Sequence, residues 1–88
     1  MENLRNKFSS IYPSLDLHGE QPELIFKIID DFINDNIKLG HNIIVIVHGK
    51  GSGVIKEETH YILKRHHKVV QFLLDPENIG QTIVEISK

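Results

Sequence analysis

The chain has 88 residues and no cysteine, which indicates one domain and excludes both a disulfide framework and a thiolate zinc site. Its formal net charge of −2 and its pI near 6.3 argue against a strongly basic, general polyanion binder. No apolar run approaches the roughly 20 residues that span a bilayer, and the first residues lack the apolar core of a secretion signal. We therefore expect a cytoplasmic protein with no membrane partner.

The N-terminal part of the chain divides into a tail and the start of a domain. Residues 1–13 show no clear periodicity and end in Pro13, so we interpret them as a tail or the end of a linker. The domain is then expected to cover residues 14–88. In residues 15–18 apolar and polar side chains alternate, as they do in a half-buried strand, which predicts the first strand there.

The next two predicted elements have the strongest patterns. Pro22 suits the first position of a helix, because its missing N–H would have no partner inside the helix. A wide apolar stripe at helical spacing, followed by Gly40, predicts that this helix covers about residues 22–39. The continuous β-branched run at 43–47 predicts a strand that is buried on both faces or lies centrally in the sheet.

A second helix and two more strands complete the chain. Inward-facing apolar residues predict a helix over about 53–66, and the run VVQFLL predicts a strand over 69–74. The segment DPENIG, residues 75–80, has the composition of a turn, and TIVEI, residues 82–86, that of a last strand. The predicted order is therefore β-α-β-α-β-β.

This order predicts an α/β fold with two layers. Helices join the first three strands, so these strands are expected to run parallel, whereas the short connection before the last strand predicts an antiparallel strand. Because β-α-β crossovers are right-handed, two crossovers in one direction across the sheet leave both helices on the same face. We therefore expect a two-layer α/β sandwich with one face of the sheet less covered.

Two of the predicted strands end in the same dipeptide, His-Gly. At the end of the first strand the dipeptide is His18-Gly19, and we call residues 16–19 the first corner. At the end of the second strand it is His48-Gly49, and we call residues 48–53 the glycine loop. Parallel strands share their carboxyl edge, which is where ligands bind in open α/β sheets. We therefore expect His18 and His48 along one edge of the molecule.

The glycine loop has the composition of a phosphate-binding turn. It leads directly into the second helix, whose free N–H groups and positive dipole end favour an anion. Its alternate glycines leave room for a phosphate, Lys50 adds a positive charge, and Ser52 can cap the helix or bind an oxygen atom. The pattern is equally typical of an ordinary turn, and its spacing matches neither a Walker A loop nor a Rossmann fingerprint. The candidate phosphate and nucleic-acid ligands are Gly19, Gly49, Lys50, Gly51, Ser52, Gly53 and Lys56.

Asp16, His18 and His48 are the candidates for catalysis. An imidazole takes up or releases a proton near neutral pH, so a histidine at this edge can act as base or acid at a phosphodiester, and His48 is the candidate acid. Asp16 can orient His18 or act as the base itself. No metal site and no certain cofactor are predicted: a divalent cation such as Mg²⁺ is an alternative, but a single obvious carboxylate makes a poor metal cage. Since a lone strand-end histidine is more often structural, the functional hypothesis depends on the pairing of the two corners.

The other histidines and the basic residues beside them have plainer explanations. We expect His41, His60, His66 and His67 at the surface, and the sequence contains no HExxH motif or zinc-ligand spacing. The stretch KRHHK, residues 64–68, suits the negative end of a helix dipole. It equally suits an extension of a nucleic-acid surface.

The two corners together resemble those of the Smr (small MutS-related) domain. The resemblance covers nearly the whole chain after the tail: LDLH at 15–18 matches the family's L-D-x-H motif, and HGKG at 48–51 matches its H/T-G-x-G loop. It implies a fold similar to the C-terminal domain of bacterial translation initiation factor three, with a mixed four-stranded sheet in the order 1-2-4-3. It also implies that Asp16 and His18 are the leading catalytic residues. The stretch at 77–86 departs from the family, many of whose members carry a glycine pair before the last strand.

The resemblance also implies nucleic acid as the partner. Smr domains occur alone or at the C-terminus of MutS-like ATPases linked to recombination and to stalled ribosomes; several members nick DNA or cleave RNA, and others bind without clear cleavage. We therefore expect an endonuclease for branched DNA or for RNA, linked to recombination control or ribosome rescue. The alternatives are a non-catalytic module that binds DNA, RNA or the ribosome, and an interaction domain without nucleic acid. The domain itself is expected to be a monomer, either alone or as part of a larger MutS-like ATPase.

Overall fold

The computed structural model describes residues 12–87, so most of the predicted tail lies outside the described residues. Within this range the elements follow the predicted order, and the strands predicted at 43–47 and 69–74 have those bounds. The elements are β1 (Ser14–Asp16), α2 (Pro22–Lys38), β2 (Ile43–Val47), α3 (Val54–Arg65), β3 (Val69–Leu74) and β4 (Gln81–Ile86).

The four strands form one mixed sheet in the order β1-β2-β4-β3. β1 pairs with β2 in parallel, and β4 lies antiparallel to both β2 and β3. β1, β2 and β3 therefore run in one direction and β4 in the other, which confirms the predicted strand order and directions. The β-branched strand β2 lies between β1 and β4, as its continuous apolar run predicted.

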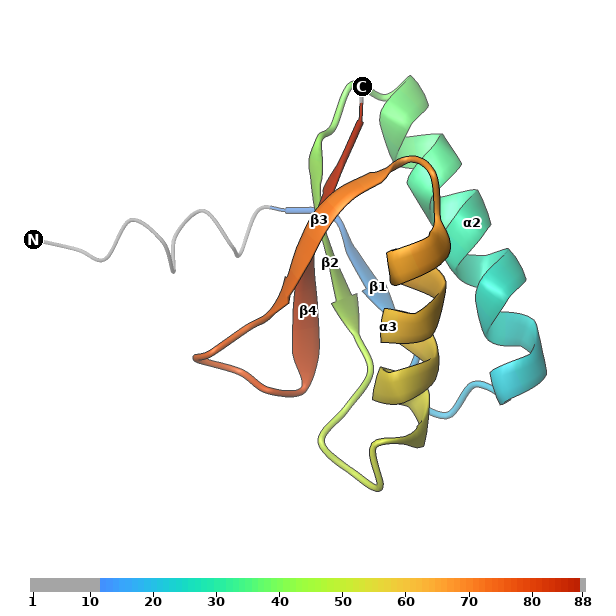
Figure 1. The fold of residues 1–88 in the computed structure, drawn as a ribbon, viewed down its shortest axis with the longest axis vertical. Coiled ribbons are helices and arrows are strands. Elements are labelled where there is room, and N and C mark those ends of the chain that lie inside the picture. The colour runs from blue at the N-terminus through green and yellow to red at the C-terminus, as the bar shows by residue number, and fades with distance from the viewer. Residues whose placement is uncertain (1–11, 88) are drawn as a thin grey trace, which may run out of the picture.

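Both helices cover the same face of the sheet, where they lie side by side (Figure 1). The helical spacing of Ile25, Ile29 and Ile33 turns all three into this layer, and each is completely buried. Burying a large aliphatic side chain contributes roughly 1.5–3 kcal/mol, so this one layer holds the fold together. The core consists of Leu17, Ile25, Ile29, Ile33, Ile44, Ile46, Ile62, Leu63, Val84 and Ile86.

The opposite face of the sheet has no helix over it in the described part of the chain (Figure 1). Leu73 and Ile83 pair across β3 and β4 on this face, and Leu73 is 61% exposed. The fold is thus the predicted two-layer sandwich with one face of the sheet less covered. Neither helix in residues 12–87 has the length and hydropathy needed to cross a membrane.

Candidate functional site

The first corner turns sharply at the end of β1. The Oδ1 atom of Asp16 accepts a hydrogen bond from the His18 N–H at 2.8 Å, while the Leu17 N–H still donates to the Val47 carbonyl at 2.7 Å. Gly19 follows with a φ of +84°, a conformation that favours glycine. The regular strand ends at Asp16, two residues earlier than predicted, because the chain turns there: the Asp16 carboxylate holds the His18 N–H and the Leu17 carbonyl accepts the Glu20 N–H at 3.0 Å.

The His18 side chain is exposed beside the glycine loop. Its Cδ2 atom lies 3.7 Å from the position that a Cβ on Gly49 would take, so the two corners lie side by side as predicted. Within residues 12–87 the His18 ring makes no hydrogen bond. The Asp16 carboxylate is bound to the backbone of His18 rather than to its ring, so Asp16 fixes the path of the chain and leaves the imidazole free to meet a ligand.

The start of the glycine loop is held against the β3–β4 turn, residues 75–80. The N–H groups of His48 and Gly49 both donate to the Gly80 carbonyl, each at 2.9 Å. A Cβ on Gly80 would lie 3.1 Å from the Lys50 Cγ atom, closer than side chains ordinarily pack. The sequence predicted this stretch as a turn and as a departure from the family, but did not indicate that it sets the position of the glycine loop.

His48 lies at the predicted edge of the sheet, but it is buried there, since the residue is only 5% exposed. Its Nε2 atom lies 2.9 Å from the Thr82 hydroxyl and its Nδ1 atom 3.1 Å from the Gly49 carbonyl. The same hydroxyl lies 2.7 Å from the Nε2 atom of His60. A carbonyl only accepts, so the neutral His48 ring carries its proton on Nδ1 and accepts from the Thr82 O–H, while His60 donates to Thr82. This His48–Thr82–His60 chain connects the loop to α3.

The expectation that the remaining histidines lie at the surface is wrong for two of them. His66 is 9% exposed and its Nε2 atom lies 2.8 Å from Asp30, while His60 is half-buried. His41 and His67 are exposed as expected. His60 flanks the buried stripe of α3, which is a usable signal, but nothing in the local sequence indicates that His66 meets a carboxylate 36 positions away.

The environment of His60 predicts a pH dependence of folding. Partial burial, followed by the nearby charges of His48 and Lys56, lowers the pKa of His60 from its ordinary value of 6.5. The unfolded chain therefore binds this proton more readily, so its contribution to stability is present above pH 6.5 and is lost as the pH falls through the folded-state pKa. We expect urea denaturation at about pH 7.5 and about pH 5.5 to show a smaller loss of stability for His60→Gln than for wild type. An equal loss in both proteins would contradict this assignment.

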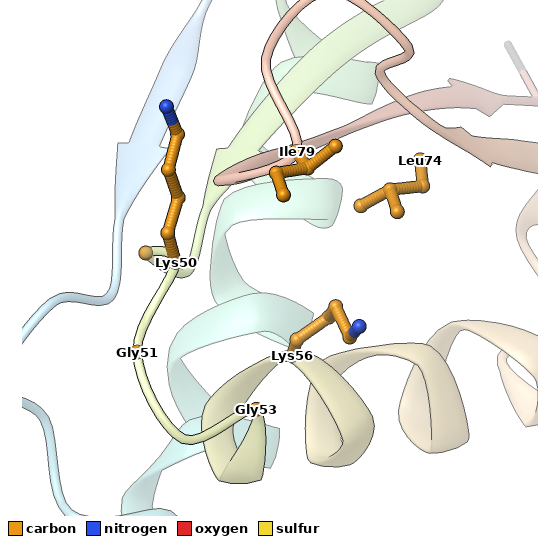
Figure 2. A pocket seen from close by; sticks show the side chains of 7 residues that line it. Lys50, Gly51, Gly53, Lys56, Leu74 and Ile79 are labelled. Atoms are coloured by element: carbon orange, nitrogen blue, oxygen red, sulfur yellow. The ribbon is translucent and has the colours of Figure 1, made fainter.

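A hollow of about 110 Å³ opens beside the glycine loop. Figure 2 shows Lys56 projecting from α3 on the side of Leu74, while Lys50 leaves the loop on another side. Five of the seven predicted phosphate ligands line this hollow; Gly19 and Ser52 are exposed outside it. The lining residues are Gly49, Lys50, Gly51, Gly53, Lys56, Leu74 and Ile79.

The beginning of α3 has no side-chain cap. Gly53 precedes the helix with a φ of +89°, and Ser52 does not cap it, which leaves the Ser52 hydroxyl to the second predicted role, oxygen binding. The first N–H groups of a helix have no partner within it and attract anions. The loop therefore presents backbone donors beside the hollow.

The residues of this edge do not form a cage for a divalent cation. Within residues 12–87 no group of three His, Asp or Glu side chains is placed to hold one metal ion. Mg²⁺ prefers several oxygen ligands, and the Asp16 carboxylate at this edge already accepts the His18 N–H.

These features define a two-layer α/β domain with a glycine-rich loop at the carboxyl edge of its sheet. The family model of the Smr domain matches residues 15–86, and the chain belongs to this family. This confirms the resemblance seen in the two corners.

Longer relatives contain a similar segment. The chain is 40% identical over 74 residues to the protein named Endonuclease MutS2 from Helicobacter pylori and 31% identical over 87 residues to that from Brevibacillus brevis. These alignments cover 84% and 96% of this chain but only 10% and 11% of the two relatives. The chain therefore spans about a tenth of the length of these relatives.

Two crystal structures have a similar fold. The Smr domain of Thermus thermophilus MutS2 superposes with a TM-score of 0.82 at 24% identity, covering 86% of this chain and 99% of that one. YdaL, a stand-alone small MutS-related protein from Escherichia coli, gives 0.77 at 23% identity, covering 100% and 77%. Both similarities confirm the fold.

Proposed function

We propose that this domain binds the phosphodiester backbone of DNA or RNA where the first corner meets the glycine loop, and that it cleaves the backbone there as an endonuclease. The observation that carries the proposal is the glycine loop itself: its glycines and Lys50 line the hollow together with Lys56, and its Gly49 lies beside the exposed imidazole of His18. The names of the relatives, Endonuclease MutS2, support a nuclease.

Binding follows from the donors around the hollow. Lys50 and Lys56 supply positive charge. The N–H groups of His48 and Gly49 already donate to Gly80, so the N–H groups at 51–53 and in the first turn of α3 are the ones that supply hydrogen bonds to a phosphate oxygen. Without side chains at Gly49, Gly51 and Gly53, an anion approaches the backbone closely. A local positive field of this kind attracts a polyanion although the whole chain carries a net charge of −2.

Cleavage requires a base, and His18 has the position for it. We assign its imidazole to remove the proton from the attacking group, water on DNA or a ribose hydroxyl on RNA. Asp16 holds the His18 backbone in place, while Lys50 and the loop N–H groups stabilise the charge that develops on the phosphate oxygens. His48 is too buried to donate a proton directly to a ligand, so we assign it a positioning role through the Gly49 carbonyl.

A nuclease assay on a branched DNA and on single-stranded RNA tests catalysis. Loss of a general base slows a reaction roughly 10²–10⁴-fold, so we expect His18→Ala to lose nearly all cleavage and to retain binding. Asp16→Ala should lose cleavage too, because the His18 backbone is released. Lys27→Gln on α2, where Lys27 only pairs with Asp31 at the surface, is the matched control and should cleave as wild type does.

The same assay separates the enzyme from a non-catalytic binding module. If the wild-type protein binds both nucleic acids and cleaves neither, the domain is the non-catalytic binding module and not an endonuclease. If the wild-type protein does not bind, or if Lys50→Gln binds as tightly as wild type, the glycine loop is not the contact. Because phosphate contacts release counterions, genuine binding must weaken as salt is raised.

A further inference from the structure

The C-terminal end of α3 carries an exposed group of aromatic and basic side chains. The guanidinium carbon of Arg65 lies 3.8 Å from the centre of the Tyr61 ring, and Tyr61 is 56% exposed. Lys64 is exposed beside them, and exposed His67 stacks on the buried ring of His66 with a centroid distance of 5.4 Å. We call Tyr61, Lys64, Arg65 and His67 the α3 platform.

The charges of the α3 platform are not neutralised by neighbouring carboxylates. In the described part of the chain neither Lys64 nor Arg65 forms an ion pair, and the Arg65 guanidinium donates only to the Tyr61 carbonyl, at 3.4 Å. The neighbouring helix α2 differs, because its Lys27 is paired with Asp31 at 3.0 Å. Further exposed carboxylates on α2 are those of Glu23 and Asp35. An approaching polyanion is therefore attracted to α3 and repelled by α2.

The helix itself sets the separation between the α3 platform and the glycine loop. α3 has 12 residues, so at 1.5 Å per residue it is about 18 Å long, with the loop at its start and the platform at its end. One nucleic-acid strand advances about 3.4 Å per nucleotide in a duplex, so about five nucleotides cover this length. Glu57 lies in the first turn of α3, with its Oε2 atom 4.0 Å from the position that a Cβ on Gly53 would take, and Glu58 follows it. A strand is therefore expected to contact the glycine loop and the platform rather than the turn that carries these two carboxylates.

We propose that the α3 platform is a second contact for the same nucleic acid and that it binds an unpaired segment of about five nucleotides whose bases are stacked as in a duplex. This inference rests on the proposed function, since the first contact is the glycine loop. An exposed tyrosine stacks any unpaired base, while guanidinium and ammonium groups bind the adjoining phosphates. The combination of ring and cations favours a single strand over a fully paired duplex, whose bases are not available for stacking.

Oligonucleotide length provides the test. Binding of labelled single-stranded RNA of about 4 and about 12 nucleotides to the 88-residue chain is measured by fluorescence anisotropy across a salt series. The double variant Lys64→Gln/Arg65→Gln should bind the longer RNA roughly tenfold more weakly and should bind the shorter one as wild type does. Its slope of log affinity against log salt should fall by about 1.4, because each lost single-strand contact removes about 0.7. Tyr61→Ala should bind the longer RNA roughly tenfold more weakly than wild type, with little change in the salt slope.

The controls distinguish failure of this inference from failure of the proposed function. Lys27→Gln removes one positive charge from α2, against the two that the double variant removes from α3, and should leave both affinities unchanged. If the double variant binds the longer RNA as tightly as Lys27→Gln does, the α3 platform is not a contact, although the glycine loop can still be one. If Lys50→Gln binds the shorter RNA as tightly as wild type does, the glycine loop is not a contact and the proposed function is wrong. Circular dichroism confirms that each variant is folded before binding is compared.

Discussion

A Thr82→Val variant is expected to lose about 2–4 kcal/mol of unfolding free energy, because a buried polar group without its partner costs about 1–3 kcal/mol and two imidazoles depend on this hydroxyl. Thr82 is completely buried, and its oxygen lies 2.9 Å from His48 and 2.7 Å from His60. Valine has a similar shape but offers neither donor nor acceptor. Urea denaturation near neutral pH measures the loss.

The structure supplies a matched control for this variant. Thr59 is equally buried, but within residues 12–87 its hydroxyl has no hydrogen-bond partner. The same substitution there, Thr59→Val, removes an unsatisfied polar atom and is expected to be neutral or stabilising. Thr82→Ser keeps the hydroxyl and should recover most of the loss. Equal effects of valine at the two threonines would show that the His48–Thr82–His60 chain contributes nothing to stability.

A His66→Ala variant is expected to lose a similar amount, about 2–4 kcal/mol, from lost packing and broken hydrogen bonds. The His66 side chain is 4% exposed; its Nε2–H donates to Asp30 at 2.8 Å, and its Nδ1 atom accepts the Lys68 N–H at 3.1 Å. One ring therefore connects α2, the end of α3 and the start of β3. Alanine leaves the Lys68 N–H without this partner. Thermal and urea denaturation both report the change.

Acid titration provides an independent check on His66. Its hydrogen bond is the main reason that the pKa of Asp30 lies below the ordinary value of 3.8. A lowered carboxyl pKa gives stability that is present above pH 3.8 and lost as the pH falls through the folded-state pKa. Wild type should therefore lose stability more steeply below about pH 4 than Asp30→Asn or His66→Ala does. The effect is modest because a third of the Asp30 side chain is exposed. Parallel acid profiles would contradict the pairing.

The fold was predictable where the pattern of the sequence is periodic. The apolar stripe of α2 and the β-branched run of β2 depend on local spacing, and their predicted bounds agree with the structure to within one residue. The first strand was predicted too long, because its alternating pattern continues to His18 while the chain turns after Leu17, where the His18 N–H donates to the Asp16 carboxylate and the Glu20 N–H to the Leu17 carbonyl. Local hydrogen-bond competition of this kind is not visible in apolar periodicity.

The candidate site was predictable only in part. Parallel strands share an edge, so the meeting of the first corner with the glycine loop follows from topology, and the position of His18 beside Gly49 confirms it. The burial of His48 was missed, because it depends on Thr82, 34 positions away, and on the exact register of β4 against β2. A strand-end histidine looks the same in sequence whether it faces solvent or the interior.

The close contact between Gly80 and Lys50 links the shape of the β3–β4 hairpin to the position of the glycine loop. The carbonyl of Gly80 accepts the N–H groups of His48 and Gly49, and a Cβ on Gly80 would lie only 3.1 Å from the Lys50 Cγ atom. A hairpin of different length or shape is therefore expected to displace the backbone of the proposed phosphate site while every proposed contact residue stays the same. Homologues with identical corners but different hairpins would then select different nucleic acids.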